Sequence, residues 1–128
     1  MSDTRAAVDA LVRSYLESFA TGDPTAIAAH VTEDFINEHV AALGTGCAGR
    51  AEYLRRLPGF LAGFPELRYE IEDVLVDGDR AAASYTLRAR PGDRDVTVRG
   101  LMRFIVRDGH IAQRTDYWDA LGYLRQVE

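Results

Sequence analysis

The sequence contains no lysine, and its 15 Lys and Arg positions are all arginine. Schiff-base catalysis by lysine is therefore excluded. The only cysteine, Cys47, cannot form a disulfide within the chain. No apolar run approaches the roughly 20 residues of a membrane-spanning helix, and Met1 to Thr4 lack the basic start and apolar stretch of a secretion signal. We therefore expect a cytoplasmic protein with no membrane partner.

Clustered positive charge is also missing. The formal net charge is -5, and the acidic residues are spread along the chain. Nucleic acids are bound by grouped Lys and Arg, so we expect no nucleic-acid partner. The chain does have an ordinary globular composition, 47% hydrophobic and 27% charged, in 128 residues. This predicts a single domain, residues 1–128, around one core.

Apolar residues recur at helical spacing in the first half of the chain. Helices are predicted over residues 4–20, from Pro24 onward, and over residues 50–62. Gly22 ends the first helix, and Asp23 is expected to cap the second. Residues 36–40 are predicted as a short strand or extended coil. The glycine-rich residues 44–49 lack the spacing of a phosphate-binding loop and are expected to be a connector.

From Leu67 onward the apolar period changes from 3.6 to 2. Strands are predicted over residues 68–77, 80–90, 94–107 and 110–118. The turns between them are short and contain glycine, which makes consecutive strands antiparallel neighbours. Helices followed by an antiparallel meander indicate an α+β fold with the helices on one face of the sheet.

The last predicted strand carries the most informative side chains. Residues two apart in a strand share a face, so Ala112, Arg114, Asp116 and Trp118 are expected on one face and Ile111 on the other. If this face borders a closed apolar space, burial raises the pKa of Asp116 and suits it to proton transfer. If Asp116 pairs with Arg114, its pKa falls instead. Both alternatives are open from the sequence, and Asp119 is interpreted as a strand-end cap.

Other reactive side chains give weaker patterns. His39 has an ordinary pKa of about 6.5 and can exchange protons near neutrality. The three histidines show no metal-binding spacing with a carboxylate pair, so no metal is expected. Cys47 has no evident base partner, which disfavours a nucleophile. Tyr15 fits the apolar stripe of its helix, with a hydroxyl that can reach a pocket.

Several short strings, in this order, resemble the nuclear transport factor two superfamily and, within it, the SnoaL-like branch. They are Tyr15 to Asp23, Asp34 to His39, Gly49 to Glu52, Phe64 to Leu67, Asp77 to Arg80, Arg103-Phe104 and Tyr117 to Asp119. The resemblance implies a cone-shaped, strongly curved antiparallel sheet wrapped around N-terminal helices, with an internal pocket. It also implies a homodimer that pairs through the sheet. The superfamily includes cyclases, isomerases, epoxide hydrolases and proteins without catalysis, so the reaction depends on the site.

Three branches of the family imply different roles for the same positions. In ketosteroid isomerases Tyr15 resembles a hydrogen-bond donor, but the base position falls at His39 and the protonated aspartic acid position at Gly100. In limonene epoxide hydrolases Asn37 and Asp116 resemble a water-positioning asparagine and an aspartate, and Phe35 replaces a tyrosine. The Arg-x-Asp pair of those enzymes is absent from residues 84–88. In SnoaL-like cyclases Asp116 falls near the catalytic acid.

We therefore predict a cofactor-independent cyclase or isomerase that acts on a small apolar or polyketide-like molecule. An epoxide hydrolase and a non-catalytic hydrophobic-ligand or dimerisation module are the alternatives. Asp116 and His39 are the predicted catalytic residues. The predicted substrate-binding residues are Tyr15, Asn37, Phe35, Met102, Phe104 and Trp118.

Overall fold

The computed structural model describes residues 2–41 and 43–128. The helices are α1 (Ser2–Ser18), α2 (Pro24–Ala28), α3 (Arg50–Gly63) and α4 (Ala120–Val127). The strands are β1 (Val31–His39), β2 (Cys47–Ala48), β3 (Arg68–Asp77), β4 (Arg80–Ala89), β5 (Val96–Arg107) and β6 (His110–Trp118). Short 3-10 turns occupy Phe19–Thr21 and Pro91–Asp93. No helix in these residues is both long enough and apolar enough to span a membrane.

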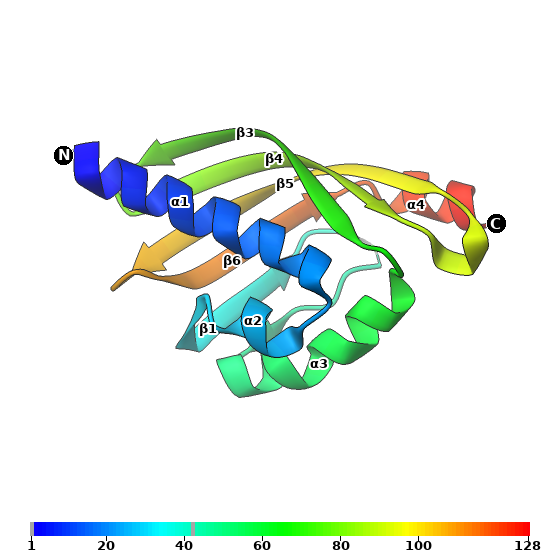
Figure 1. The fold of residues 1–128 in the computed structure, drawn as a ribbon, viewed down its shortest axis with the longest axis horizontal. Coiled ribbons are helices and arrows are strands. Elements are labelled where there is room, and N and C mark those ends of the chain that lie inside the picture. The colour runs from blue at the N-terminus through cyan, green and yellow to red at the C-terminus, as the bar shows by residue number, and fades with distance from the viewer. Residues whose placement is uncertain (1, 42) are drawn as a thin grey trace.

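The predicted α+β class is confirmed, and the sheet curves over the helices. Figure 1 shows α1 lying along the inner face of the sheet, with α2 and α3 beside it and α4 beyond one end. The sheet order is β2-β1-β6-β5-β4-β3. Left-handed glycines at the turns, including Gly78 and Gly109, allow the β3–β4 and β5–β6 hairpins. The sequence therefore determines this half of the sheet by local turn chemistry.

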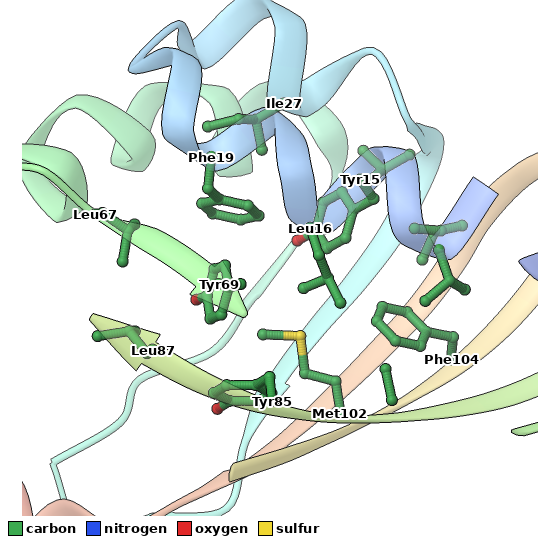
Figure 2. Close-up of a cluster of buried hydrophobic side chains, with 14 of the residues drawn as sticks. Tyr15, Leu16, Phe19, Ile27, Leu67, Tyr69, Tyr85, Leu87, Met102 and Phe104 are labelled. Carbon is green, nitrogen blue, oxygen red and sulfur yellow. The ribbon is translucent and has the colours of Figure 1, made fainter. Parts of the chain in front are cut away.

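The predicted helices form where their caps and apolar stripes place them. Asp23 accepts a hydrogen bond from the Thr25 backbone N–H at 3.0 Å, and Pro24 occupies the first turn of α2. Gly22 ends the preceding turn in a left-handed conformation. The inner face of α1 buries Val8, Val12, Tyr15 and Leu16. In Figure 2, Leu16 and Phe19 point toward Met102 and toward the tyrosines of the facing strands.

The expectation of a purely antiparallel sheet is wrong at one strand. Residues 36–40 were predicted as a short strand or coil, whereas β1 runs from Val31 to His39 and pairs in parallel with β6. The sheet is therefore mixed. A parallel pair joins segments about 80 residues apart, as in the register of His39 with Asp116, and no turn signal marks such a pairing. Helix α4 was also not predicted, and Asp119 caps its start by accepting the Gly122 N–H at 2.8 Å.

A bulge changes the face of one residue on β6. Gln113 pairs with Ile105, but the next pair is Ile111 with Val106, so Ala112 is an extra residue on this strand. The bulge places Ile111 in the core, fully buried, on the side that also holds Arg114 and Asp116. Strict alternation had assigned Ile111 to the opposite face.

Candidate functional site

Asp116 lies in the middle of the sheet, because β6 has β1 on one side and β5 on the other. It is opposite His39 on β1 and Met102 on β5. Only 4% of the residue is exposed. A carboxylate at such a position needs hydrogen-bond partners, and the neighbouring strands supply them.

Tyr85 provides the shortest contact of this carboxylate. Its hydroxyl donates a hydrogen bond to Asp116 Oδ1 at 2.6 Å, although β4 is two strands away from β6. The ring crosses β5 at Gly100, where a Cβ atom would clash with the Tyr85 hydroxyl and lie 2.7 Å from the Tyr117 carbonyl oxygen. Tyr69 packs edge-on against the Tyr85 ring at 5.0 Å. Gly100 therefore makes room for a hydroxyl that comes from another strand.

Arg114 shares this face with Asp116 but donates its hydrogen bonds to other residues. Its Nε donates to Asn37 Oδ1 at 3.0 Å, and its terminal nitrogens donate to the Tyr15 hydroxyl at 2.8 Å and to His39 Nε2 at 3.3 Å. Among the described residues, no ion pair joins Arg114 to Asp116 within 4.0 Å. The sequence left two alternatives open, an Asp116 in apolar surroundings and an Asp116 paired with Arg114. The structure has the first, with Tyr85 as the hydrogen-bond partner of the carboxylate.

Burial dominates the proton affinity of Asp116. Burial raises the pKa of this carboxyl, while the positive charge of Arg114 and the hydrogen bond from Tyr85 lower it, and the net pKa is raised. A raised pKa brings a carboxyl closer to the range in which it can both accept and return a proton near neutrality.

The contacts of His39 determine which of its nitrogens carries the proton. Arginine can only donate, so Nε2 accepts from Arg114 and the neutral ring carries its hydrogen on Nδ1. Nδ1 lies 3.9 Å from Asp116 Oδ2 and is buried without a hydrogen-bond partner in the described residues. Burial and Arg114 lower the pKa of His39 to about 4. At neutral pH His39 is therefore an uncharged N–H donor.

Asp116 borders a cavity of about 270 Å³ that we call the aromatic cavity. Its walls come from β1, β3, β4, β5, β6, α3, α4 and the segment after β1. The lining residues are His39, Leu43, Gly44, Thr45, Phe60, Phe64, Tyr69, Tyr85, Leu87, Val98, Asp116, Trp118 and Tyr123. Trp118 Nε1 is a second buried N–H without a partner in the described residues. The cavity is thus mainly apolar, with one carboxylate and two unused donors.

A second cavity of about 420 Å³, the arginine cavity, adjoins the first. His39, Thr45 and Phe60 line both. The other lining residues are Phe19, Asn37, Cys47, Tyr53, Arg55, Arg56, Leu57, Gly59 and Arg114. His39 therefore lies on the wall between a carboxylate and a guanidinium.

The remaining predicted site residues lie in the core. Phe35, Met102 and Phe104 are at most 2% exposed and line neither the aromatic nor the arginine cavity. Tyr15 is fully buried, and its hydroxyl is hydrogen-bonded to Arg114 and to the Tyr53 hydroxyl. These residues pack in the core next to the site and do not line either cavity. In residues 2–41 and 43–128, no three His, Cys, Asp or Glu side chains form a group that could hold a metal ion.

Comparison with known proteins decides the family. The sequence profile described as the SnoaL-like domain matches residues 12–114. The chain belongs to the SnoaL-like family. No protein with a curated description matches the sequence of this SnoaL-like domain.

Solved structures with the same fold have diverse descriptions. A proposed polyketide cyclase from Xanthomonas campestris is 25% identical, with a TM-score of 0.80, and the match covers 98% of this SnoaL-like chain and 99% of the other. An epoxide hydrolase of the LEH-like type from M. tuberculosis is 21% identical, with a TM-score of 0.82 over 96% and 93% of the two chains. A Catenulispora acidiphila protein with a ketosteroid isomerase-like fold, in complex with trimethylamine, is 16% identical, with a TM-score of 0.83 over 91% and 90%. The fold is thus shared by proteins with different assignments.

Sequence reasoning missed Tyr85 as a partner of Asp116. The alternation of β4 places Tyr85 on the inner face among Ala81, Ala83 and Leu87, where it supplies the only hydroxyl. A lone hydroxyl on an otherwise apolar strand face is a usable signal, because a buried hydroxyl requires a partner. The orientation of Arg114 had no such signal, since its acceptors come from β1 and α1.

Proposed function

We propose that this SnoaL-like protein is a cofactor-independent enzyme that transfers protons on a small, mainly apolar or polyketide-like molecule. Asp116 is the general acid and base. The observation that carries the proposal is the buried Asp116 carboxylate, which borders the aromatic cavity and is held by Tyr85 instead of by Arg114. A carboxyl in this environment has a raised pKa and a defined orientation, which are the requirements of general acid-base catalysis.

The proposed reaction begins at a carbon next to a carbonyl group. Asp116 removes a proton from this carbon, and the Nδ1–H of His39 donates a hydrogen bond to the oxygen on which negative charge develops. Asp116 then returns the proton at another carbon, which is an isomerisation. Alternatively, the carbanion attacks a second carbonyl carbon and closes a ring, and Asp116 returns the proton to the alkoxide oxygen formed there. In this proposal His39 is a hydrogen-bond donor and not a base, because the nitrogen that faces the aromatic cavity carries a proton.

The other predicted residues take supporting roles in this proposal. Asn37 and Tyr15 hold the guanidinium that fixes the tautomer of His39. Trp118 supplies the second free N–H and part of the wall. Phe35, Met102 and Phe104 pack behind the site.

Epoxide hydrolysis is the second candidate reaction, and the adjacency of Asn37, Arg114 and Asp116 on β1 and β6 favours it. This cluster presents amide and guanidinium groups beside a carboxylate, which can orient a water molecule. The resemblance to epoxide hydrolases expects an Arg-x-Asp pair on β4, where this chain has Tyr85. We therefore place isomerisation or cyclisation first.

Binding without turnover is the rival from another class. Five aromatic rings besides Trp118 line the aromatic cavity, and a structure of the same fold holds trimethylamine. A binding module needs the cavity but not the proton affinity of Asp116. The two proposals therefore differ in what the loss of this carboxylate does.

Proton exchange in D₂O tests the proposal without knowledge of the natural substrate. The protein is incubated with a panel of small ketones and diketones, and loss of the α-proton signals is followed by NMR. We expect exchange with at least one ketone, reduced by roughly 100-fold or more in Asp116→Asn. Asp73→Asn, an exposed aspartate on β3, is the matched control. A folded Asp116→Asn variant with undiminished exchange would sink the proposal.

We also propose a homodimer that pairs through the outer face of the sheet. Leu75 on β3 and Leu101 on β5 lie on this face and are 66% and 38% exposed. Light scattering should give twice the monomer mass, and Leu75→Glu should reduce it. Leu121→Glu on α4, which is 57% exposed, is the control. A monomeric wild-type protein at micromolar concentration contradicts this proposal.

A further inference from the structure

Arg114 is a buried cation that has no ion-pair partner within 4.0 Å among the described residues. Only 4% of the residue is exposed, and all three of its acceptors, Asn37, Tyr15 and His39, are neutral groups. The carboxylate of Asp116 on the same face is beyond ion-pair distance and accepts from Tyr85. Burial of a charge is costly unless an opposite charge or a full set of hydrogen bonds compensates it.

The hydrogen bonds of Arg114 are also incomplete. A guanidinium has five N–H groups in a planar fork. Three of them donate to protein acceptors, one from each nitrogen. One N–H on each terminal nitrogen is left without an acceptor among the described residues. A carboxylate oxygen can accept a charge-assisted hydrogen bond from such an N–H group.

The arginine cavity has the composition of an anion site. Arg55, Arg56 and Arg114 line it, and none of its lining residues is an aspartate or glutamate. Glu52 pairs with Arg55 and Arg56 at the exposed end, so Arg114 is the lining arginine that has no ion-pair partner among the described residues. The remaining wall includes Leu57 and Phe60, which suit an apolar body.

We propose that the arginine cavity binds the carboxylate of a small organic acid through the free N–H groups of Arg114, with the apolar body of the acid directed toward the aromatic cavity. The claim that the acid binds depends only on the arginine cavity. The claim that this acid is the substrate rests on the proposed function. Since His39, Thr45 and Phe60 line both cavities, one molecule can bridge them. Asp116 borders only the aromatic cavity, which keeps the two negative groups apart. The substrate class is thus a small carboxylic acid with an apolar, reactive end.

Benzoate and benzamide are suitable probes, because they have nearly the same shape and differ in charge. Their dissociation constants are measured with the wild-type protein by NMR titration at neutral pH and low salt. We expect benzoate to bind about tenfold more tightly or better, as a charge-assisted hydrogen-bond pair requires. Equal affinities for benzoate and benzamide would overturn the inference, and this comparison needs no variant.

Variants assign the preference to Arg114. Arg114→Lys should retain a smaller preference for benzoate, because the charge stays and the fork is lost. Arg114→Met should lose it. Arg103→Met on the outer face, at a residue that lines neither cavity, should keep the wild-type ratio. Loss of the preference in Arg103→Met, or its retention in a folded Arg114→Met, would overturn the assignment.

The Asp116→Asn variant separates this inference from the proposed function. We expect it to bind benzoate at least as tightly as the wild type, because a neighbouring negative charge is removed, and to lose proton exchange. Undiminished exchange in this variant removes the acid-base proposal and leaves the anion site intact. Equal binding of benzoate and benzamide removes the anion site and leaves the acid-base proposal.

Discussion

Removal of the Tyr85 hydroxyl should raise the pKa of Asp116 further. The hydroxyl donates at 2.6 Å to a nearly buried carboxylate, and this bond favours the ionised form. A hydrogen bond to a charged group contributes about 1.5–3 kcal/mol. One pKa unit corresponds to about 1.36 kcal/mol, so Tyr85→Phe should raise the pKa by about 1–2 units. The phenylalanine ring keeps the edge-on contact with Tyr69.

The assay is an NMR titration of protein with ¹³C-labelled aspartate side chains. Tyr69→Phe is the matched control, because its ring lines the same cavity and its hydroxyl makes no hydrogen bond to Asp116. If Asp116 is the base, the pH dependence of α-proton exchange should shift upward with the pKa in Tyr85→Phe. A pKa that stays unchanged or falls in Tyr85→Phe would refute the view that this hydroxyl stabilises the carboxylate. An equal rise in Tyr69→Phe would assign the effect to general cavity polarity.

Three further predictions concern stability. The pKa of His39 is about 4 in the folded protein, below its usual 6.5, so the stability present above pH 6.5 is lost as pH falls toward 4. In His39→Asn, the free energy of unfolding should decrease by about 1–2 kcal/mol less over this pH range than in the wild type, after allowance for partial exposure. Urea unfolding at several pH values measures this difference, and an unchanged pH dependence contradicts the prediction. Gly100→Ala should cost about 1–3 kcal/mol by displacing the Tyr85 hydroxyl. Gly59→Ala in α3, where a Cβ meets open space, should stabilise by about 0.5–1 kcal/mol; equal melting temperatures for these two variants would contradict the clash. Asp119→Ala should cost about 1 kcal/mol and speed amide exchange in α4, and unaltered exchange there would rule out the cap.

Local signals determine much of this fold. Alternation in residues 80–89 and glycines at the turns predict the β3–β4 and β5–β6 hairpins, because these patterns directly indicate side-chain faces and allowed backbone angles. Asp23 and Pro24 predict the start of α2 for the same reason. The family resemblance supplied the curvature of the sheet and placed Asp116 in the site.

Long-range pairing explains what the sequence could not show. β1 was predicted too short because its partner, β6, is far away in the chain, and strand length depends on that partner. The orientation of Arg114 follows from the same pairing, since β1 brings Asn37 and His39 within its reach. An ion pair between Arg114 and Asp116 was one of the two alternatives that the sequence left open. The bulge at Ala112 is likewise absent from any alternating pattern.

The position of His39 between the two cavities links them thermodynamically. Its Nε2 accepts from Arg114 and its Nδ1 faces Asp116, so a charge placed near the guanidinium alters the proton affinity of the imidazole. Linkage is reciprocal, and the same factor must then describe how protonation of His39 changes the affinity for an anion. The same free energy of coupling can therefore be measured in two ways, as the change in the pKa of His39 when an anion binds or as the change in anion affinity when His39 is protonated.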